Sequence, residues 1–347
     1  MTDCDLKKQF SENHIITDCT GKGSVMVYVK KFFLDEVIDG APHIPHPAFI
    51  VDSKELDGIY ISKFQNVVID GRAYSLPDQD PATNITFDRA SDACLTKGNG
   101  FHLMTAAEWG AVALWCQKNG HLPFGNNDIG KDIREEKTVA RPSFVDKERG
   151  IFRVATGSGP VEWSHNRNPD GIYDLNANVW EWVSGLRLVY GELQILSSIK
   201  CSATPDSDDW RAIDGTDGSL LMPDKRGTTK NSIKLDNVDG CWTYVTNKLS
   251  SREDSIRFCR FADVKADTSI CNKAKELLYA LGCLLPYYNP ELSQVSLYAN
   301  NGAAERIAFR GGRWGQGLNS GIFKTCLDDP RSYSGDAVGF RSAYYEI

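Results

Sequence analysis

The sequence predicts an α+β fold, because strand patterns and helical patterns follow one another along the first third of the chain. Residues 25–69 contain short alternating apolar runs separated by turns, which is typical of strands. Residues 86–97 and 105–119 instead repeat apolar side chains at helical spacing. The chain has 347 residues, of which 41% are hydrophobic, so it can bury a substantial core in one large or two medium domains.

Two strands are predicted before the helices. Residues 25–29 and 59–64 are short runs rich in β-branched and aromatic side chains, and the proline-rich run 42–49 separates them. His43 and His46 lie in that run and could be taken for a metal-binding pair. The prolines force an extended loop, however, so no carboxylate is held at helical spacing on one face with these histidines. We therefore predict no metal site there.

Three helices are predicted from spacing and end signals. The first covers residues 86–97 and is ended by Gly98. The second begins at a capping box, Thr105–Glu108, and ends before Gly120. The third covers residues 271–281, where alanine and leucine form an apolar stripe that we expect to pack on the main body.

Charge and composition exclude several classes of function. A net charge of -7 and a pI near 5.5 disfavour binding to nucleic acid or to an anionic membrane. The first residues contain no apolar stretch, so we expect neither a signal peptide nor a membrane anchor. No window approaches the roughly 20 apolar residues of a membrane-spanning helix, so membrane insertion is not expected either.

Ten cysteines are scattered singly along the chain, and none belongs to a CxxC motif. This spacing disfavours a disulfide framework or a structural zinc site. We therefore predict buried free thiols.

The segment between Phe309 and Arg341 has the composition of a binding surface. The runs Phe309–Trp314 and Gly339–Arg341 enclose an interior rich in Gly, Asn, Ser, Asp, Arg and Tyr. The pattern RGG-x-W-x-x-G-x-x-x-G-x-F-x-x-x-L followed by GFR resembles the variable region of proteins diversified by diversity-generating retroelements. These elements rewrite adenines in Asn-type codons of one gene end.

The resemblance implies two sets of residues. The constant frame would comprise Gly311, Gly312, Trp314, Gly317, Gly321, Phe323, Leu327, Gly339, Phe340 and Arg341. The expected ligand-binding residues are Arg313, Trp314, Gly315, Gln316, Asn319, Cys326, Asp328, Asp329, Tyr333, Gly335 and Ala337. We expect the varied side chains to point to solvent. Changes at both adenines of AAC reach every residue except Gln, Glu, Lys, Met and Trp, so Gln316 lies outside that code.

Two further motifs resemble the formylglycine-generating enzymes. Leu103–Trp109 is similar to their L-P-T-E-A-E-W segment, and Gly171–Trp182 is similar to G-L-x-D-x-x-G-N-V-W-E-W. We expect Trp180 and Trp182 to be core aromatics on a strand. The resemblance implies a C-type lectin fold of the formylglycine-generating-enzyme type, with a small twisted antiparallel sheet, two flanking helices and long loops.

The same resemblance raises the question of calcium. In the enzymes, side chains matching Asp174 and Glu181 and carbonyls matching Ala177 and Val179 can hold this ion, and hard oxygen ligands suit it. Ala177 stands where the family has glycine. The sequence leaves calcium binding open.

The predicted organisation is an N-terminal segment at 1–24 and one lectin-type domain at 25–347. Residues 187–305 exceed what the family core needs, so we interpret them as an insertion, entered through a hairpin at 185–195. The variable region covers about 309–341.

A binding function explains these features better than an enzymatic one. The family's thiol chemistry needs a cysteine pair near the C-terminus, and this segment contains only Cys326. No H-x-D or H-x-E motif offers an iron site, and the calcium-binding tripeptides of sugar-binding lectins are absent. An ordinary loop without a partner stays open as an alternative.

We therefore predict a non-enzymatic ligand- or receptor-binding protein without a cofactor, acting as a phage tail-tip adhesin. Its partner would be a host-cell surface receptor or another macromolecule. Its location would be the phage virion or the cytoplasm of the producing bacterium. The alternatives are a formylglycine-generating-enzyme-like oxidoreductase and a bacterial surface protein. The sequence names neither the ligand nor the oligomeric state.

Overall fold

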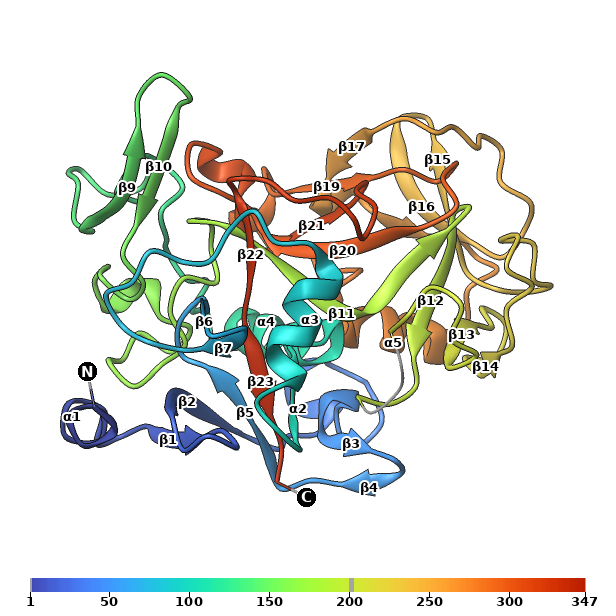
Figure 1. Cartoon of the computed structure of the whole chain (residues 1–347). Coiled ribbons are helices and arrows are strands. Elements are labelled where there is room, and N and C mark those ends of the chain that lie inside the picture. Colours follow the sequence, from blue (N-terminus) through green and yellow to red (C-terminus); the bar gives the residue numbers. More distant parts are fainter. Residues whose placement is uncertain (1, 200–202, 347) are drawn as a thin grey trace.

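A computed structural model describes residues 2–199 and 203–346, whose strands form two main sheets and three two-stranded ones (Figure 1). The small sheet has five antiparallel strands in the order β1-β2-β5-β23-β8. Its strands are β1 (His14–Thr17), β2 (Gly23–Lys30), β5 (Gly58–Ser62), β23 (Ser342–Tyr344) and β8 (Phe101–Leu103). The strands predicted at 25–29 and 59–64 are thus confirmed as β2 and β5.

The two predicted helices are present, and they lie between the small sheet and a large sheet. Helix α3 (Phe87–Leu95) begins after its N-cap Thr86, and α4 (Ala106–Lys118) begins with the predicted capping box of Thr105 and Glu108. Helix α3 contacts strands of both sheets, and α4 packs on β11 of the large sheet. The helices therefore join the two sheets into one body.

The large sheet has twelve strands in the part of the chain that the structure describes. Its main order is β17-β19-β21-β20-β11-β12-β15-β16-β18, and β13, β14 and β22 pair outside this path. The strands are β11 (Trp180–Val189), β12 (Glu192–Leu196), β13 (Trp210–Ile213), β14 (Leu220–Leu221), β15 (Lys234–Val238), β16 (Cys241–Val245), β17 (Arg257–Arg260), β18 (Lys265–Ala266), β19 (Ser296–Ala299), β20 (Arg306–Gly311), β21 (Gly321–Leu327) and β22 (Val338–Phe340).

The segment at 187–305 is built into this sheet. Strand β19 inserts parallel to β21, and β17 follows at the sheet end. The predicted hairpin is formed by β11 and β12, and the predicted helix is α5 (Asn272–Ala280). Helix α5 approaches α4 so closely that a Cβ added at Gly110 would lie 2.0 Å from the carbonyl oxygen of Ala280. The insertion therefore shares the core of the domain.

The remaining elements are short. They are α1 (Asp3–Gln9), α2 (Leu34–Val37), β3 (Ile50–Val51), β4 (Lys54–Glu55), β6 (Val67–Ile69), β7 (Arg72–Tyr74), β9 (Pro142–Asp146) and β10 (Ile151–Val154), with 3-10 turns at Pro47–Phe49, Val161–Trp163, Phe261–Asp263, Pro290–Leu292 and Gly317–Asn319. Strands β9 and β10 form a separate hairpin, which projects at the upper left of Figure 1. Among the described residues, no helix has the length and apolar character needed to cross a membrane.

The cysteines are free but not uniformly buried. Nine lie in the described ranges, and all nine are unpaired. Cys4 and Cys19 are exposed, and Cys241 and Cys271 are partly exposed, so the expectation of burial was wrong for these four. They lie on the short helix α1, just after β1, at the start of β16 and at the N-cap of α5. Cys201 lies outside the described residues.

Candidate functional site

One cavity collects most of the residues predicted to bind a ligand. Its volume is about 220 Å³, and we call it the variable pocket. Six of the eleven predicted residues line it, namely Arg313, Gln316, Cys326, Asp329, Tyr333 and Ala337. These residues come from the turn after β20, from β21 and from the loop between β21 and β22. Folding therefore brings together positions that are spread along the whole variable region.

Five further residues complete the wall, and sequence reasoning did not assign them to the site. They are Trp180, Ile256, Tyr298, Phe309 and Val338. Ile256 and Tyr298 belong to the insertion. Ile256 is 57% exposed, and the neighbouring Phe258 is 64% exposed and stacks on the ring of Tyr298 with centroids 5.3 Å apart. The insertion thus adds an apolar wall to the pocket. No local pattern in the sequence placed these two residues beside the variable region.

Main-chain hydrogen bonds hold the loop between β21 and β22 in place. The carbonyl of Asp329 accepts from the Ile307 N–H at 3.1 Å, and that of Gly335 accepts from Asn84 at 2.9 Å. The carbonyl of Ala337 accepts from Trp180 at 2.8 Å. Any residue type can make these bonds, because they use no side-chain atom. The loop can therefore keep its path while its side chains change.

Trp314 belongs to the frame rather than to the pocket wall. Its side chain is 4% exposed, packs with Ile151 and Val179, and donates from the indole nitrogen to the Gly150 carbonyl at 2.8 Å. It therefore ties the turn after β20 to the hairpin of β9 and β10. Gly311 and Gly312, at φ of 89° and 94°, adopt the left-handed backbone that favours glycine, as predicted.

The remaining predicted positions surround the pocket without lining it. Gly315 and Asn319 are exposed on the turn before β21, and Asp328 and Gly335 are partly exposed on the loop that follows. The expectation that all varied side chains point to solvent was wrong for Cys326, which is 5% exposed. Its position on β21, at the bottom of the pocket, places the thiol inside the structure.

Burial raises the pKa values of two side chains on the acidic side of the pocket. Burial, reinforced by the charge of Asp328, raises the pKa of Asp329 to about 6. Burial and the carboxylate of Asp329 raise the pKa of Cys326 well above its usual value. A thiol in this state resists becoming a thiolate, which is the form that reacts or binds a soft metal. The pocket therefore disfavours thiolate chemistry.

A buried cation lies beneath the pocket. Lys324 is fully buried, donates to the Ser296 hydroxyl at 2.8 Å, and lies 4.8 Å and 5.3 Å from the ring centroids of Tyr298 and Trp180. Burial lowers the pKa of its amine to about 7. Cation–π contacts of this kind offset part of the cost of burying the charge. Lys324 thus fixes two aromatic residues of the pocket wall.

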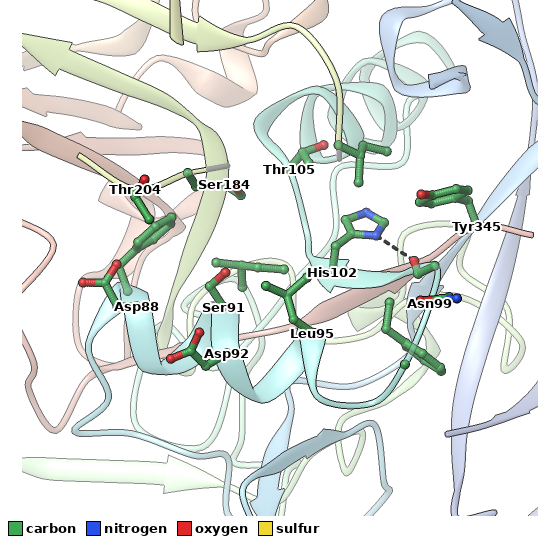
Figure 2. A pocket seen from close by; sticks show the side chains of 17 residues that line it. Asp88, Ser91, Asp92, Leu95, Asn99, His102, Thr105, Ser184, Thr204 and Tyr345 are labelled. Carbon is green, nitrogen blue, oxygen red and sulfur yellow. Dashed lines mark hydrogen bonds between the residues drawn. The ribbon is translucent and has the colours of Figure 1, made fainter. Parts of the chain in front are cut away.

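A larger cavity, of about 690 Å³, contains none of the predicted site residues (Figure 2). Asp88, Ser91, Asp92 and Leu95 of α3 face it, and His102 lies across from them. The Nδ1 atom of His102 lies 3.0 Å from the Gly100 carbonyl, and Nε2 lies 2.9 Å from a carboxylate oxygen of Glu108. Both ring nitrogens are therefore engaged, so His102 is not free to activate the neighbouring hydroxyl groups.

The histidines of the proline-rich run have structural roles. His43 pairs with Asp35 at 3.0 Å and stacks on Phe33. His46 is fully buried and contacts the Ala280 carbonyl, and burial lowers its pKa to about 3. Within residues 2–199 and 203–346, no group of three or more His, Cys, Asp or Glu side chains is arranged to hold a metal ion.

Comparison with known proteins places this fold in context. Residues 29–205, just over half of the chain, match the model of the sulfatase-modifying factor enzyme 1-like domain. Both sequence motifs, Leu103–Trp109 and Gly171–Trp182, lie inside the matched range, and the predicted fold type is confirmed.

Two solved structures are similar along most of their length. PvdO from Pseudomonas aeruginosa is 14% identical with a TM-score of 0.40, and the match covers 96% of this chain and 98% of that chain. Treponema denticola variable protein 1 is 11% identical with a TM-score of 0.31, again covering 96% and 98%. No curated protein matches the sequence.

Proposed function

The chain belongs to the family of sulfatase-modifying factor enzyme 1-like domains, and from this premise we propose that it uses the family fold to bind a macromolecular ligand without catalysis. The observation that carries the proposal is the variable pocket. Six predicted ligand-binding residues, from Arg313 to Ala337, line one cavity. Rigid aromatic residues and polar groups together are typical of binding surfaces.

We further propose that a retroelement diversifies this pocket. The sequence pattern from Phe309 to Arg341 supports this, as does the way the loop is held. Its main-chain bonds to Ile307, Asn84 and Trp180 do not depend on side-chain identity. Variation could therefore change recognition without changing the fold. This separation is what a diversified binder requires.

As a setting, we propose a phage tail tip whose ligand is a receptor on the host-cell surface. A bacterial surface protein is the alternative. In both settings the pocket would contact a macromolecule, and the apolar side chains of Ile256 and Phe258 would extend the contact area. Exposed apolar groups beside a pocket commonly mark such interaction sites.

The oxidoreductase alternative has family membership in its favour but lacks support from Cys326. That residue is buried, and burial raises the pKa of its thiol well above the usual value. The enzymes need thiolates of lowered pKa. A direct test is conversion of a cysteine-containing sulfatase peptide with copper supplied. We expect no conversion by the wild type, and conversion that is lost in Cys326→Ser would reject the non-enzymatic proposal.

The neighbouring DNA tests the retroelement part. A near copy of the segment encoding about 309–341 should lie close to the gene, beside a reverse transcriptase reading frame. The copy should carry AAC or AAT at the codons for Arg313, Gly315, Asn319, Cys326, Asp328, Asp329, Tyr333, Gly335 and Ala337. Differences at template G, C or T, or the absence of both template and reverse transcriptase, would reject diversification.

A library experiment tests binding itself. The six pocket positions are randomised with AAC-type variation, displayed, and selected against purified lysozyme as an arbitrary protein target. The control library varies three exposed residues of β4 and the turn that follows it, namely Lys54, Glu55 and Asp57. We expect binders only from the pocket library. Equal enrichment in both libraries would show that the pocket has no special capacity to bind.

A further inference from the structure

Gln65 lies at the centre of a cluster of oxygen atoms. Its side chain is fully buried, just after β5. The amide nitrogen Nε2 lies 3.2 Å from the carbonyl oxygens of Asp174 and Ala177, 3.0 Å from that of Val179, and 3.0 Å from Oε1 of Glu181. Four acceptors from one loop thus converge on a single nitrogen atom that comes from a distant part of the chain.

The orientation of the Gln65 amide follows from its neighbours. Its oxygen Oε1 accepts a hydrogen bond from Nδ2 of Asn178 at 2.9 Å. Rotating the amide by half a turn would place that oxygen against four other oxygens and would leave the Asn178 donor facing an NH₂ group. Both changes are unfavourable, so the nitrogen must face the cluster.

The backbone of the loop turns these carbonyls inward. Asp174, Ala177 and Asn178 have φ angles of 62°, 65° and 58°, in the left-handed region that non-glycine residues rarely adopt. Such strain persists only where the surrounding contacts fix it, at about 1–3 kcal/mol per residue. Here the convergent contacts with Gln65 supply that fixation.

The oxygen atoms of this cluster are of the kind that bind a cation. Three carbonyl oxygens and one carboxylate oxygen are hard ligands of the kind that calcium prefers. An amide has only two N–H groups, so it cannot satisfy four acceptors with linear bonds. In addition, Oδ1 of Asp174 is buried without a hydrogen-bond partner. The cluster therefore contains more acceptor atoms than the N–H groups of the protein can satisfy.

Calcium nevertheless does not fit with Gln65 in place. The ion binds oxygens at about 2.3–2.6 Å, and the centre of this cluster already holds the amide nitrogen. The charge of Glu181 is also balanced, because its carboxylate receives two bonds of 2.6 Å from Arg341. A neutral amide and one guanidinium thus stand where a cation would lie, and only Oδ1 of Asp174 keeps no hydrogen-bond partner in this cluster.

We propose that the side chain of Gln65 is an internal substitute for a divalent cation. Its amide connects the loop at 174–181 to the strand after which it lies, in the place that family resemblance assigns to calcium. The wild-type protein therefore folds without calcium, and removing the amide creates a calcium site. This inference concerns the scaffold, and it does not depend on the ligand-binding proposal.

The test compares wild-type protein, Gln65→Ala and Gln65→Asn in EDTA and in millimolar calcium chloride. Gln65→Asn withdraws the amide by one methylene and leaves a smaller gap. The matched control is Gln194→Ala, because Gln194 is an equally buried glutamine that donates to the carboxylate of Glu192 instead of to a carbonyl cluster. Melting temperature is measured, together with terbium luminescence excited through the nearby tryptophans.

We expect the melting temperature of the wild type and of Gln194→Ala to be the same in both solutions. Calcium should raise that of Gln65→Ala by about 4 °C, the size expected when the ion is present at about a hundred times its Kd. Terbium should bind only the two Gln65 variants. Stoichiometric terbium binding by the wild type, or Gln65 variants that calcium fails to stabilise or to fold, would overturn the proposal.

Discussion

The guanidinium of Arg341 donates a hydrogen bond to each carboxylate oxygen of Glu181, at 2.6 Å each, and both side chains are buried. Glu181 lies on β11 of the large sheet, and Arg341 lies between β22 of that sheet and β23 of the small sheet. The pair therefore fixes the end of the variable region to both sheets. Arg341 also donates to the carbonyls of Ser62 and Tyr173, so few of its N–H groups remain free.

Breaking this pair should destabilise the protein strongly. Arg341→Met leaves the Glu181 carboxylate buried without its partner, and we expect a loss of about 3–5 kcal/mol in the free energy of unfolding. The control is Arg260→Ala, which breaks an exposed pair with Asp263 and should cost far less, because solvent screens that pair. Urea unfolding monitored by circular dichroism gives both values. Equal costs would contradict the structural role assigned to Arg341.

Frame and pocket should respond differently to substitution. Trp314→Ala and Phe340→Ala remove buried rings and should each cost about 3–5 kcal/mol. Replacing Asn319 or Tyr333, which are exposed, should change stability by about 0.5 kcal/mol or less each. Thermal denaturation of the four variants checks the ranking. The reverse order would refute the division between a constant frame and a variable surface.

The ionised carboxyl of Asp329 in the pocket should lower the free energy of unfolding at neutral pH. Its folded pKa, about 6, is above the ordinary value of 3.8. The folded state therefore favours the protonated form, whose contribution is present below about pH 4 and is lost as the pH rises through about 6. Asp329→Asn should be more stable than the wild type at pH 7 by about 1–2 kcal/mol, after allowance for partial exposure.

Urea unfolding at pH 4 and pH 7 tests this difference. The difference in the free energy of unfolding between Asp329→Asn and the wild type should be smaller at pH 4 than at pH 7. As a control, Asp57→Asn changes a fully exposed side chain and should leave the free energy of unfolding nearly the same as that of the wild type in both solutions. A difference for Asp329→Asn that stays constant between the two pH values would show that the carboxyl is not destabilised by burial.

Cys326 should react slowly with iodoacetamide in the native protein. Each unit by which the pKa rises lowers the thiolate fraction about tenfold at neutral pH, and burial limits access as well. Cys4 and Cys19 are exposed and serve as internal references. Peptide mass spectrometry after timed alkylation measures the rates. Labelling of Cys326 as fast as that of Cys4 would show an open, activated thiol.

Local signals in the sequence predicted much of the fold. The helix at 106–118 was predictable because the Thr105–Glu108 capping box acts over three residues. The fold type followed from two short motifs that lie close to the core. The variable-region pattern named six residues that the structure brings together in one cavity, and their role in ligand binding stays a prediction.

Other features depend on contacts that sequence spacing does not encode. Ile256 and Tyr298 reach the pocket because β19 pairs with β21, a neighbour in space but not in sequence. Gln65 meets a loop more than a hundred residues later in the chain. Neither contact leaves a periodic signal in the sequence, because the first is strand pairing within the large sheet and the second joins segments far apart in the chain.

The place of β23 has a consequence for synthesis of the protein. This strand, at 342–344, lies inside the small sheet between β5 and β8. The sheet cannot close until the ribosome has released the residues that follow the variable region. A product truncated before Ser342 would expose two unpaired strand edges, which promote aggregation. We therefore expect chaperones and proteases to remove chains that lack β23.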